Sequence, residues 1–345
     1  MMKRIKYYTF LMPAIIFSLL IACENGTEST KTSLPVLSIS AEESGYIYLD
    51  GQYTGLKTPA EITVSKGEHV IGVAMKESAT YLRKELKVSE DVEIALTASD
   101  KAEPKVWKAL WVGIHEVTGA SLTGSCSSRF SKEELDAGFE FFQWGIKNQF
   151  EPYSYGTMQW DIERKDIDTP VELYKTSNNW FTLEPNSIAD MLPQVKPGNY
   201  DVVFVFWREK DGACSFQSSY FGLAWTDPLN EPIKTGYITI KFDAEDDINK
   251  KIEWYKNNDP GVWVHEWLHT VGENFFQDRG ERLPEKGDDG LVIHAAEKYN
   301  YTYPWLDWYD DFIGGRVKDI GQSNAYCGIG PEAFLKKSLR ESAIE

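Results

Sequence analysis

The most informative segment of this chain is DPGVWVHEWLH, which occupies residues 259–269. Asp259 and Pro260 stand where an N-cap and a first-turn proline are favoured, and from Val262 to Phe276 the one helix breaker is Gly272. We therefore expect a helix that begins at Asp259. The two histidines of the segment are four residues apart, so they project from one face of this helix.

This spacing matches the HExxH pattern of zinc hydrolases. His265 and His269 can both reach one Zn²⁺ ion at about 2.0 to 2.1 Å, with Glu266 beside them. Zinc bound by neutral ligands keeps a position for water and lowers the pKa of that water toward about 7, and Glu266 would accept its proton as general base. The sequence thus predicts a zinc-dependent hydrolase. The alternative is a buried helix whose histidines pack beside Trp263 and Trp267.

A catalytic zinc ion needs a third protein ligand. Metzincins place His or Asp six residues after the second histidine, but this chain has Phe275 there, and no methionine follows Met191 to form their Met-turn. Gluzincins use a downstream glutamate, for which the candidates are Glu281, Glu285 and Glu297. His294 is the one histidine after the motif. We predict His294 as the third ligand, with Glu297 orienting an imidazole or replacing His294.

The segment around the predicted third ligand also carries a resemblance. Residues 294–301, HAAEKYNY, together with residues 305–312, resemble the downstream part of exported bacterial HExxH proteins. This resemblance implies a peptide or protein substrate.

The N-terminal 22 residues predict export. A short basic head precedes an apolar run, residues 7–22, that is too short to span a bilayer comfortably. The run ends in LIAC, which resembles a bacterial lipobox, so we expect cleavage before Cys23 and lipid on its sulfur. Residues 1–22 would be a signal peptide and residues 23–33 a lipidated tether. The protein would then be a lipoprotein of the bacterial cell envelope, periplasmic or surface-exposed. An uncleaved membrane anchor is the alternative.

Residues 34–98 predict a small all-β domain. Short alternating runs are broken at Asp50-Gly51 and at Lys66-Gly67, which predicts hairpins. Three segments resemble the PEGA domain, a small surface-associated β-sandwich: GYIYLDGQYTG at 45–55, TPA at 58–60 and GEHVI at 67–71. The chain departs from the tetrad that names this family. The resemblance implies a spacer or adhesive module without catalytic residues.

Residues 99–105 read as a linker, and residues 106–345 as one larger α+β domain of zincin-like type. Ser131 and Glu134 fit a capping box at the start of a helix. Strands are expected at 107–117, 201–207 and 236–242. The predicted fold class is therefore multi-domain, with a small β-sandwich followed by a mixed α and β domain.

Composition excludes several classes of protein. The chain has 36 Lys and Arg against 53 Asp and Glu, a formal charge of -17, so nucleic acid is not an expected partner. Its 42% hydrophobic content supports a folded core.

Cys126, Cys214 and Cys327 allow at most one disulfide within the exported chain, and without a Cys-x-x-Cys pair they exclude a thiolate zinc site. Their spacing leaves the pairing open.

Two hypotheses follow for the function. The first is a lipid-anchored exported zinc metallopeptidase that hydrolyses peptide bonds with a zinc-bound water and a glutamate base. The second is a non-catalytic cell-surface binding protein that keeps a zincin-like fold.

Overall fold

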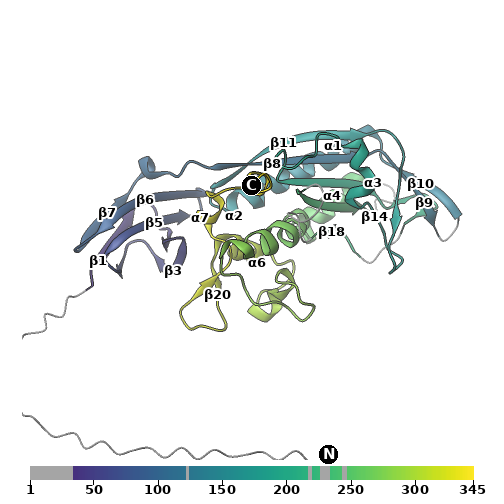
Figure 1. Cartoon of the computed structure of the whole chain (residues 1–345). Helices are drawn as coiled ribbons and strands as arrows, with labels where there is room; N and C mark the ends of the chain where they lie inside the picture. Colours follow the sequence, from purple (N-terminus) through teal and green to yellow (C-terminus); the bar gives the residue numbers. More distant parts are fainter. Residues whose placement is uncertain (1–33, 122–123, 217–219, 226–233, 243–246) are drawn as a thin grey trace, which may run out of the picture. The chain divides into compact units, whose positions relative to one another are not determined.

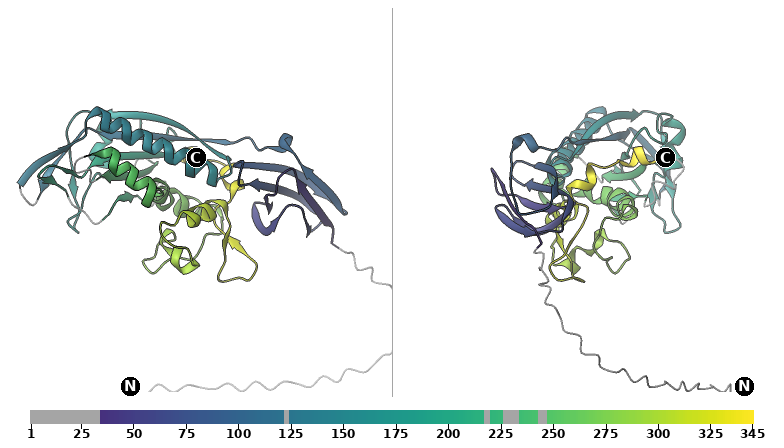
Figure 2. Two further views of the ribbon diagram at one scale, coloured as in Figure 1. Left: turned by 180° about the vertical axis from the view of Figure 1, so that it is seen from behind. Right: turned by 60° about the vertical axis from the view of Figure 1, so that its left-hand side comes forward.

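The computed structural model has a β-rich N-terminal region followed by a mixed α/β region (Figures 1 and 2). It describes residues 34–121, 124–216, 220–225, 234–242 and 247–345. The predicted signal peptide, Cys23 and the tether lie outside these residues. Within the described ranges, no helix is long and apolar enough to cross a membrane.

The N-terminal region is a sandwich of two sheets. One sheet has the order β4-β1-β7, with β1 (Val36–Ala41), β4 (Ala60–Thr63) and β7 (Val92–Leu96). The other has the order β3-β2-β5-β6, with β2 (Tyr46–Leu49), β3 (Gln52–Lys57), β5 (Gly67–Met75) and β6 (Thr80–Val88). Apolar residues from both sheets form one buried cluster that includes Leu37, Ile47, Ile71, Val73, Leu82 and Ile94. The prediction of a small all-β region is confirmed.

One of the two predicted hairpins in this sandwich is correct. Asp50 and Gly51, with φ of 52° and 85°, form the turn between the paired strands β2 and β3. The prediction of a hairpin at Lys66-Gly67 is wrong, because β4 and β5 belong to different sheets and this turn carries the chain from one sheet to the other.

The mixed region is built on a five-stranded sheet with the order β11-β8-β15-β19-β18. Its strands are β8 (Lys105–Ile114), β11 (Met158–Ile167), β15 (Val202–Arg208), β18 (Gly222–Ala224) and β19 (Gly236–Phe242). The strands β11, β8, β15 and β19 are parallel, and β18 is an antiparallel edge strand. The strands predicted at 201–207 and 236–242 are confirmed. The single strand predicted at 107–117 is wrong, because β8 ends at Ile114 and Glu116 begins a strand of another sheet.

Layers of chain cover both faces of this sheet. Val202, Phe204 and Phe206 of β15 pack on one face against the helices α1 (Lys132–Gly145), α4 (Ile248–Asn258) and α5 (Val262–Trp267). The intervening residues Val203, Val205 and Trp207 pack on the other face, against residues between positions 171 and 216. Because both faces are buried, β15 reads as a continuous apolar run.

The helix with the two histidines begins later than predicted. Asp259 ends α4, because its backbone N–H donates to the carbonyl of Tyr255, and α5 begins at Val262. The prediction of an N-cap at Asp259 is therefore wrong: the proline marks the corner between two helices. Beyond Trp267 the helix widens to a π-helical segment, η4 (Leu268–Phe275). The capping box of Ser131 and Glu134 is confirmed.

The remaining elements are short. They are η1 (Ala98–Asp100), β9 (Glu116–Ser121), β10 (Gly124–Arg129), η2 (Ile146–Phe150), α2 (Glu151–Tyr153), β12 (Val171–Glu172), β13 (Tyr174–Lys175), β14 (Phe181–Thr182), α3 (Pro185–Ile188), η3 (Ala189–Met191), β16 (Lys210–Asp211), β17 (Cys214–Ser215), η5 (Gln277–Arg279), η6 (Ile293–Tyr299), α6 (Leu306–Gly314), β20 (Val317–Lys318), β21 (Tyr326–Cys327), α7 (Pro331–Phe334) and α8 (Leu339–Ser342).

One disulfide joins Cys126 of β10 to Cys214 of β17, 88 residues apart. Cys327 is buried and unbridged. The structure thus identifies the two cysteines that pair, which the sequence leaves open. It agrees with the prediction that the three cysteines form at most one disulfide.

Arg316 connects the sandwich to the mixed region. Its buried guanidinium pairs with Asp310 at 3.0 Å and Asp311 at 2.8 Å, and it lies 4.6 Å from the ring centroid of Tyr46 in β2. Lys76 of the sandwich pairs with Asp310 at 2.7 Å. Residues 34–345 accordingly group into a single unit by their contacts. The predicted domain boundaries and the linker at 99–105 stay predictions.

We expect Arg316→Met to lower the free energy of unfolding by about 3 kcal/mol, because it takes the buried guanidinium away from the buried carboxylate of Asp310, which keeps Lys76, and from the half-buried carboxylate of Asp311. Urea unfolding followed by tryptophan fluorescence measures this. The control, Lys147→Met, removes an exposed pair with Glu151 and should cost no more than about 1 kcal/mol. Equal losses in the two variants would contradict the structural role of Arg316.

Candidate metal centre

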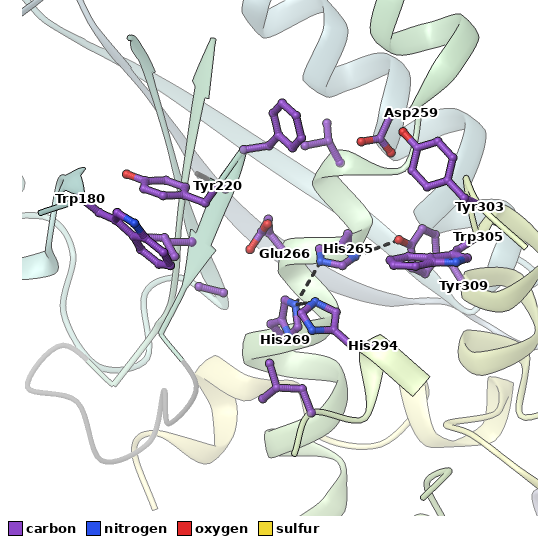
Figure 3. Close-up of a pocket in the computed structure, with 16 residues that line it drawn as sticks. Trp180, Tyr220, Asp259, His265, Glu266, His269, His294, Tyr303, Trp305 and Tyr309 are labelled. Atoms are coloured by element: carbon purple, nitrogen blue, oxygen red, sulfur yellow. Dashed lines mark hydrogen bonds between the residues drawn. The ribbon is translucent and has the colours of Figure 1, made fainter. Parts of the chain in front are cut away.

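Three imidazoles meet at one point (Figure 3). His265 comes from α5, His269 from the π-helical segment η4, and His294 from η6. The Nε2 atom of His269 lies 3.1 Å from Nε2 of His265 and 3.2 Å from Nε2 of His294. Two nitrogens bound tetrahedrally to one zinc ion at about 2.0 to 2.1 Å are about 3.3 to 3.4 Å apart. The three nitrogens therefore fit a single ion of this size.

The second nitrogen of each ring is held by another side chain. The Nδ1 atom of His265 lies 2.8 Å from the hydroxyl of Tyr309. The Nδ1 atom of His269 lies 3.3 Å from Oε1 of Glu273, and Nδ1 of His294 is bound to the carboxylate of Asp289. Since a carboxylate only accepts, Nδ1 carries the hydrogen in His269 and His294. Their Nε2 lone pairs are then available for a cation.

Glu273 links the second histidine to the third. Its Oε1 atom holds the ring of His269, while its Oε2 atom accepts the backbone N–H groups of Val292 at 2.7 Å and Ile293 at 3.0 Å. These two residues directly precede His294. One buried carboxylate therefore fixes both the rotation of a ring on the helix and the position of the turn that carries the next ring.

The electrostatics of the cluster suit a cation. Burial, with the two neighbouring imidazoles, holds the pKa of His265 well below its usual range, so the ring is neutral, as a ligand must be. Burial, with a smaller contribution from Asp259, raises the pKa of Glu266 to about 8. A cation at the point where the three rings meet would lower the pKa of Glu266.

Glu266 depends on a glycine of the edge strand for its space. A Cβ atom at Gly222 of β18 would lie 2.5 to 2.6 Å from three side-chain atoms of Glu266. Any larger residue at this position would displace the carboxyl group. The contact brings β18 directly against the predicted catalytic residue.

The four predicted site residues lie together in the structure, while the glutamates weighed as alternatives lie elsewhere. Glu297 is exposed and is not part of the cluster. Glu281 pairs with Lys336, and Glu285 pairs with Lys298. Sequence reasoning missed the three side chains that hold the rings: Tyr309, Glu273 and Asp289. Of these, Glu273 alone has a signal in the sequence, because it follows His269 by four residues.

The histidines line a cavity of about 560 Å³. On one side lie β18 and the rings of Trp180 and Tyr220, and on the other Tyr303, Trp305 and Tyr309, with Asp259 at one end (Figure 3). Trp263 and Trp267, by contrast, are fully buried in the core. The imidazoles thus face the cavity, in contrast to the alternative in which they only pack beside these tryptophans. The volume suits a small ligand or a short segment of a longer one.

Comparison with known proteins identifies one domain. The PEGA domain family matches residues 34–99, in agreement with the resemblance seen in the sequence. No curated protein matches this chain. Among solved structures, metalloproteinase-II from Bacteroides fragilis is similar at 10% identity over 74% of this chain and 78% of that chain, with a TM-score of 0.28. This likeness is too distant to indicate a shared fold or activity.

We expect Glu273→Gln to lower the affinity for zinc by about 10- to 100-fold, because an amide cannot hold the imidazole N–H and both backbone N–H groups as a carboxylate does. Competition with a chromophoric chelator measures this. The control, Glu297→Gln, should leave the affinity unchanged. Loss of zinc in the control variant alone would assign the ligand role to Glu297 instead.

Proposed function

We propose that this chain is a zinc metallopeptidase, held by lipid at the bacterial cell envelope. The proposal rests on one observation: three imidazole nitrogens converge beside a buried glutamate in the wall of a cavity. Zinc in such a site supplies Lewis acidity toward a carbonyl oxygen and acidifies water. The ligands would be His265, His269 and His294.

Glu266 is the proposed general base. Its carboxyl group lines the cavity next to His265, and within the described part of the chain no group donates a hydrogen bond to it. A buried carboxylate without a structural partner is costly. A position of this kind suits a group that takes a proton from water and passes it to the leaving nitrogen.

The edge strand β18 supports a peptide substrate. An extended peptide can add to an exposed sheet edge through main-chain hydrogen bonds, and β18 has β19 as its one neighbour in the described sheet. Because Gly222 of β18 lies against Glu266, a peptide bound along this edge would pass the proposed base.

A non-catalytic binding protein of the cell surface is the alternative. The PEGA domain at residues 34–99 favours it, because the predicted role of this module is that of a spacer or adhesive. This alternative gives no reason for a buried, unpartnered Glu266 beside three convergent imidazoles. The peptidase proposal explains both features.

We expect Glu266→Gln to keep stoichiometric zinc and to lower kcat/KM by about 10²- to 10⁴-fold, because the amide cannot accept a proton from water. A peptide-library digest followed by mass spectrometry measures turnover, and elemental analysis measures zinc. Glu297→Gln is the matched control and should keep full turnover. Unchanged turnover in Glu266→Gln would remove this residue from the mechanism, and wild type without zinc would count against the whole proposal.

The lipid anchor is proposed from Cys23 and the apolar run before it. We expect Cys23→Ser to abolish incorporation of an alkyne-tagged fatty acid and to move the protein from the membrane to the soluble fraction, because the acceptor sulfur is lost. The control, Cys327→Ser, changes a buried and unbridged thiol and should keep the label. A labelled Cys23→Ser protein would refute the lipobox assignment.

A further inference from the structure

Asp259 places an unpartnered carboxyl group in the same cavity (Figure 3). Its backbone N–H closes α4, whereas its side chain receives no hydrogen bond and forms no ion pair with any residue that the structure describes. The carboxyl group is partly buried, and this burial raises its pKa to about 6. A desolvated acid of this kind gains stability from any cation that enters the cavity.

The surroundings of Asp259 suit a cation. Tyr303 and Tyr309 line the same cavity as Asp259, and Figure 3 shows the Asp259 carboxyl group next to the ring of Tyr303. Burial, with a smaller contribution from the charge of Asp259, raises the pKa of both phenols. The faces of such rings attract ammonium and guanidinium groups. Among the residues described, no lysine or arginine lines the cavity, so no group of the chain itself supplies the missing charge.

The position of Asp259 separates it from the predicted reaction centre. Asp259 precedes His265 by six positions in the chain and lies at the corner before α5 begins. Asp259 lies toward the N-terminal end of α5, on the side of His265 that is away from His269. A long substrate side chain or a chain terminus can reach this point while the bond to be cleaved lies at the histidines.

We infer that the cavity selects substrates with a cationic group, either a Lys or Arg side chain or a free α-amino group, and that Asp259 is the residue that determines this specificity. The inference rests on the proposed peptidase function, because it names the substrate class of the same site. Each of these groups carries an ammonium or guanidinium ion that can pair with the Asp259 carboxylate and pack against the aromatic rings.

A matched peptide series tests the inference. The peptides share one sequence and carry Lys, Arg or norleucine at each scanned position, with the N-terminus either free or acetylated. Zinc-loaded wild type should show a kcat/KM at least ten-fold higher for Lys or Arg than for norleucine, or for free than for acetylated termini. Asp259→Asn should bring that ratio close to one. The control, Asp307→Asn, removes an exposed acid outside the cavity lining and should keep the wild-type ratio.

Peptide binding separates this inference from the proposed function. Fluorescence anisotropy on zinc-loaded Glu266→Gln should show the same ten-fold preference, and the double variant Glu266→Gln/Asp259→Asn should lose it. Cleavage of all peptides at equal rates would overturn the role of Asp259 and leave the peptidase proposal standing. A preference in binding without cleavage of any peptide by wild type would support the role of Asp259 and overturn the peptidase proposal. If acetylation of the N-terminus removes the preference and replacement of Lys or Arg by norleucine does not, Asp259 recognises the α-amino group.

Discussion

The candidate site depends on the hydrogen bonds of one buried carboxylate. Glu273 accepts from the imidazole of His269 and from two backbone N–H groups directly before His294. Without it, a helix and a separate turn would each be free to place their ring independently. Three nitrogens can face one small ion only when such rotations are fixed in advance, and outer hydrogen bonds are the usual means in metal proteins.

The sheet provides the fixed reference for this arrangement. Both faces of β15 and its neighbours are covered, which makes the core that supports α5 rigid and closely packed. The edge strand β18 then closes one side of the cavity, and Gly222 lets it approach Glu266 within van der Waals contact. The site is therefore built where a helix, a sheet edge and a later turn meet, and no single segment contains it.

The sequence predicts the parts of this site that follow from local spacing. His265 and His269 are found from helical periodicity, and His294 from the count of remaining histidines. Tyr309 and Asp289 have no such signal, because their approach to the rings depends on how the turn between residues 280 and 305 folds. The proline after Asp259 predicts a helix start at the wrong place, since the sequence alone does not distinguish a first-turn proline from one at a corner between two helices. The PEGA region is recognisable in the sequence because its glycines and its Thr-Pro step are local features.

The bridge between Cys126 and Cys214 has a thermodynamic consequence for where this protein can work. It closes a covalent loop of 88 residues that contains α1 and the strands β11 and β15, which are two of the five strands of the central sheet. Because the bridge lowers the entropy of the unfolded chain, it adds about 4 to 5 kcal/mol to the free energy of unfolding at 25 °C in the chain-entropy description. That is comparable with the whole stability of many domains. A thiol-reducing cytosol would forfeit this contribution, whereas an oxidising envelope preserves it.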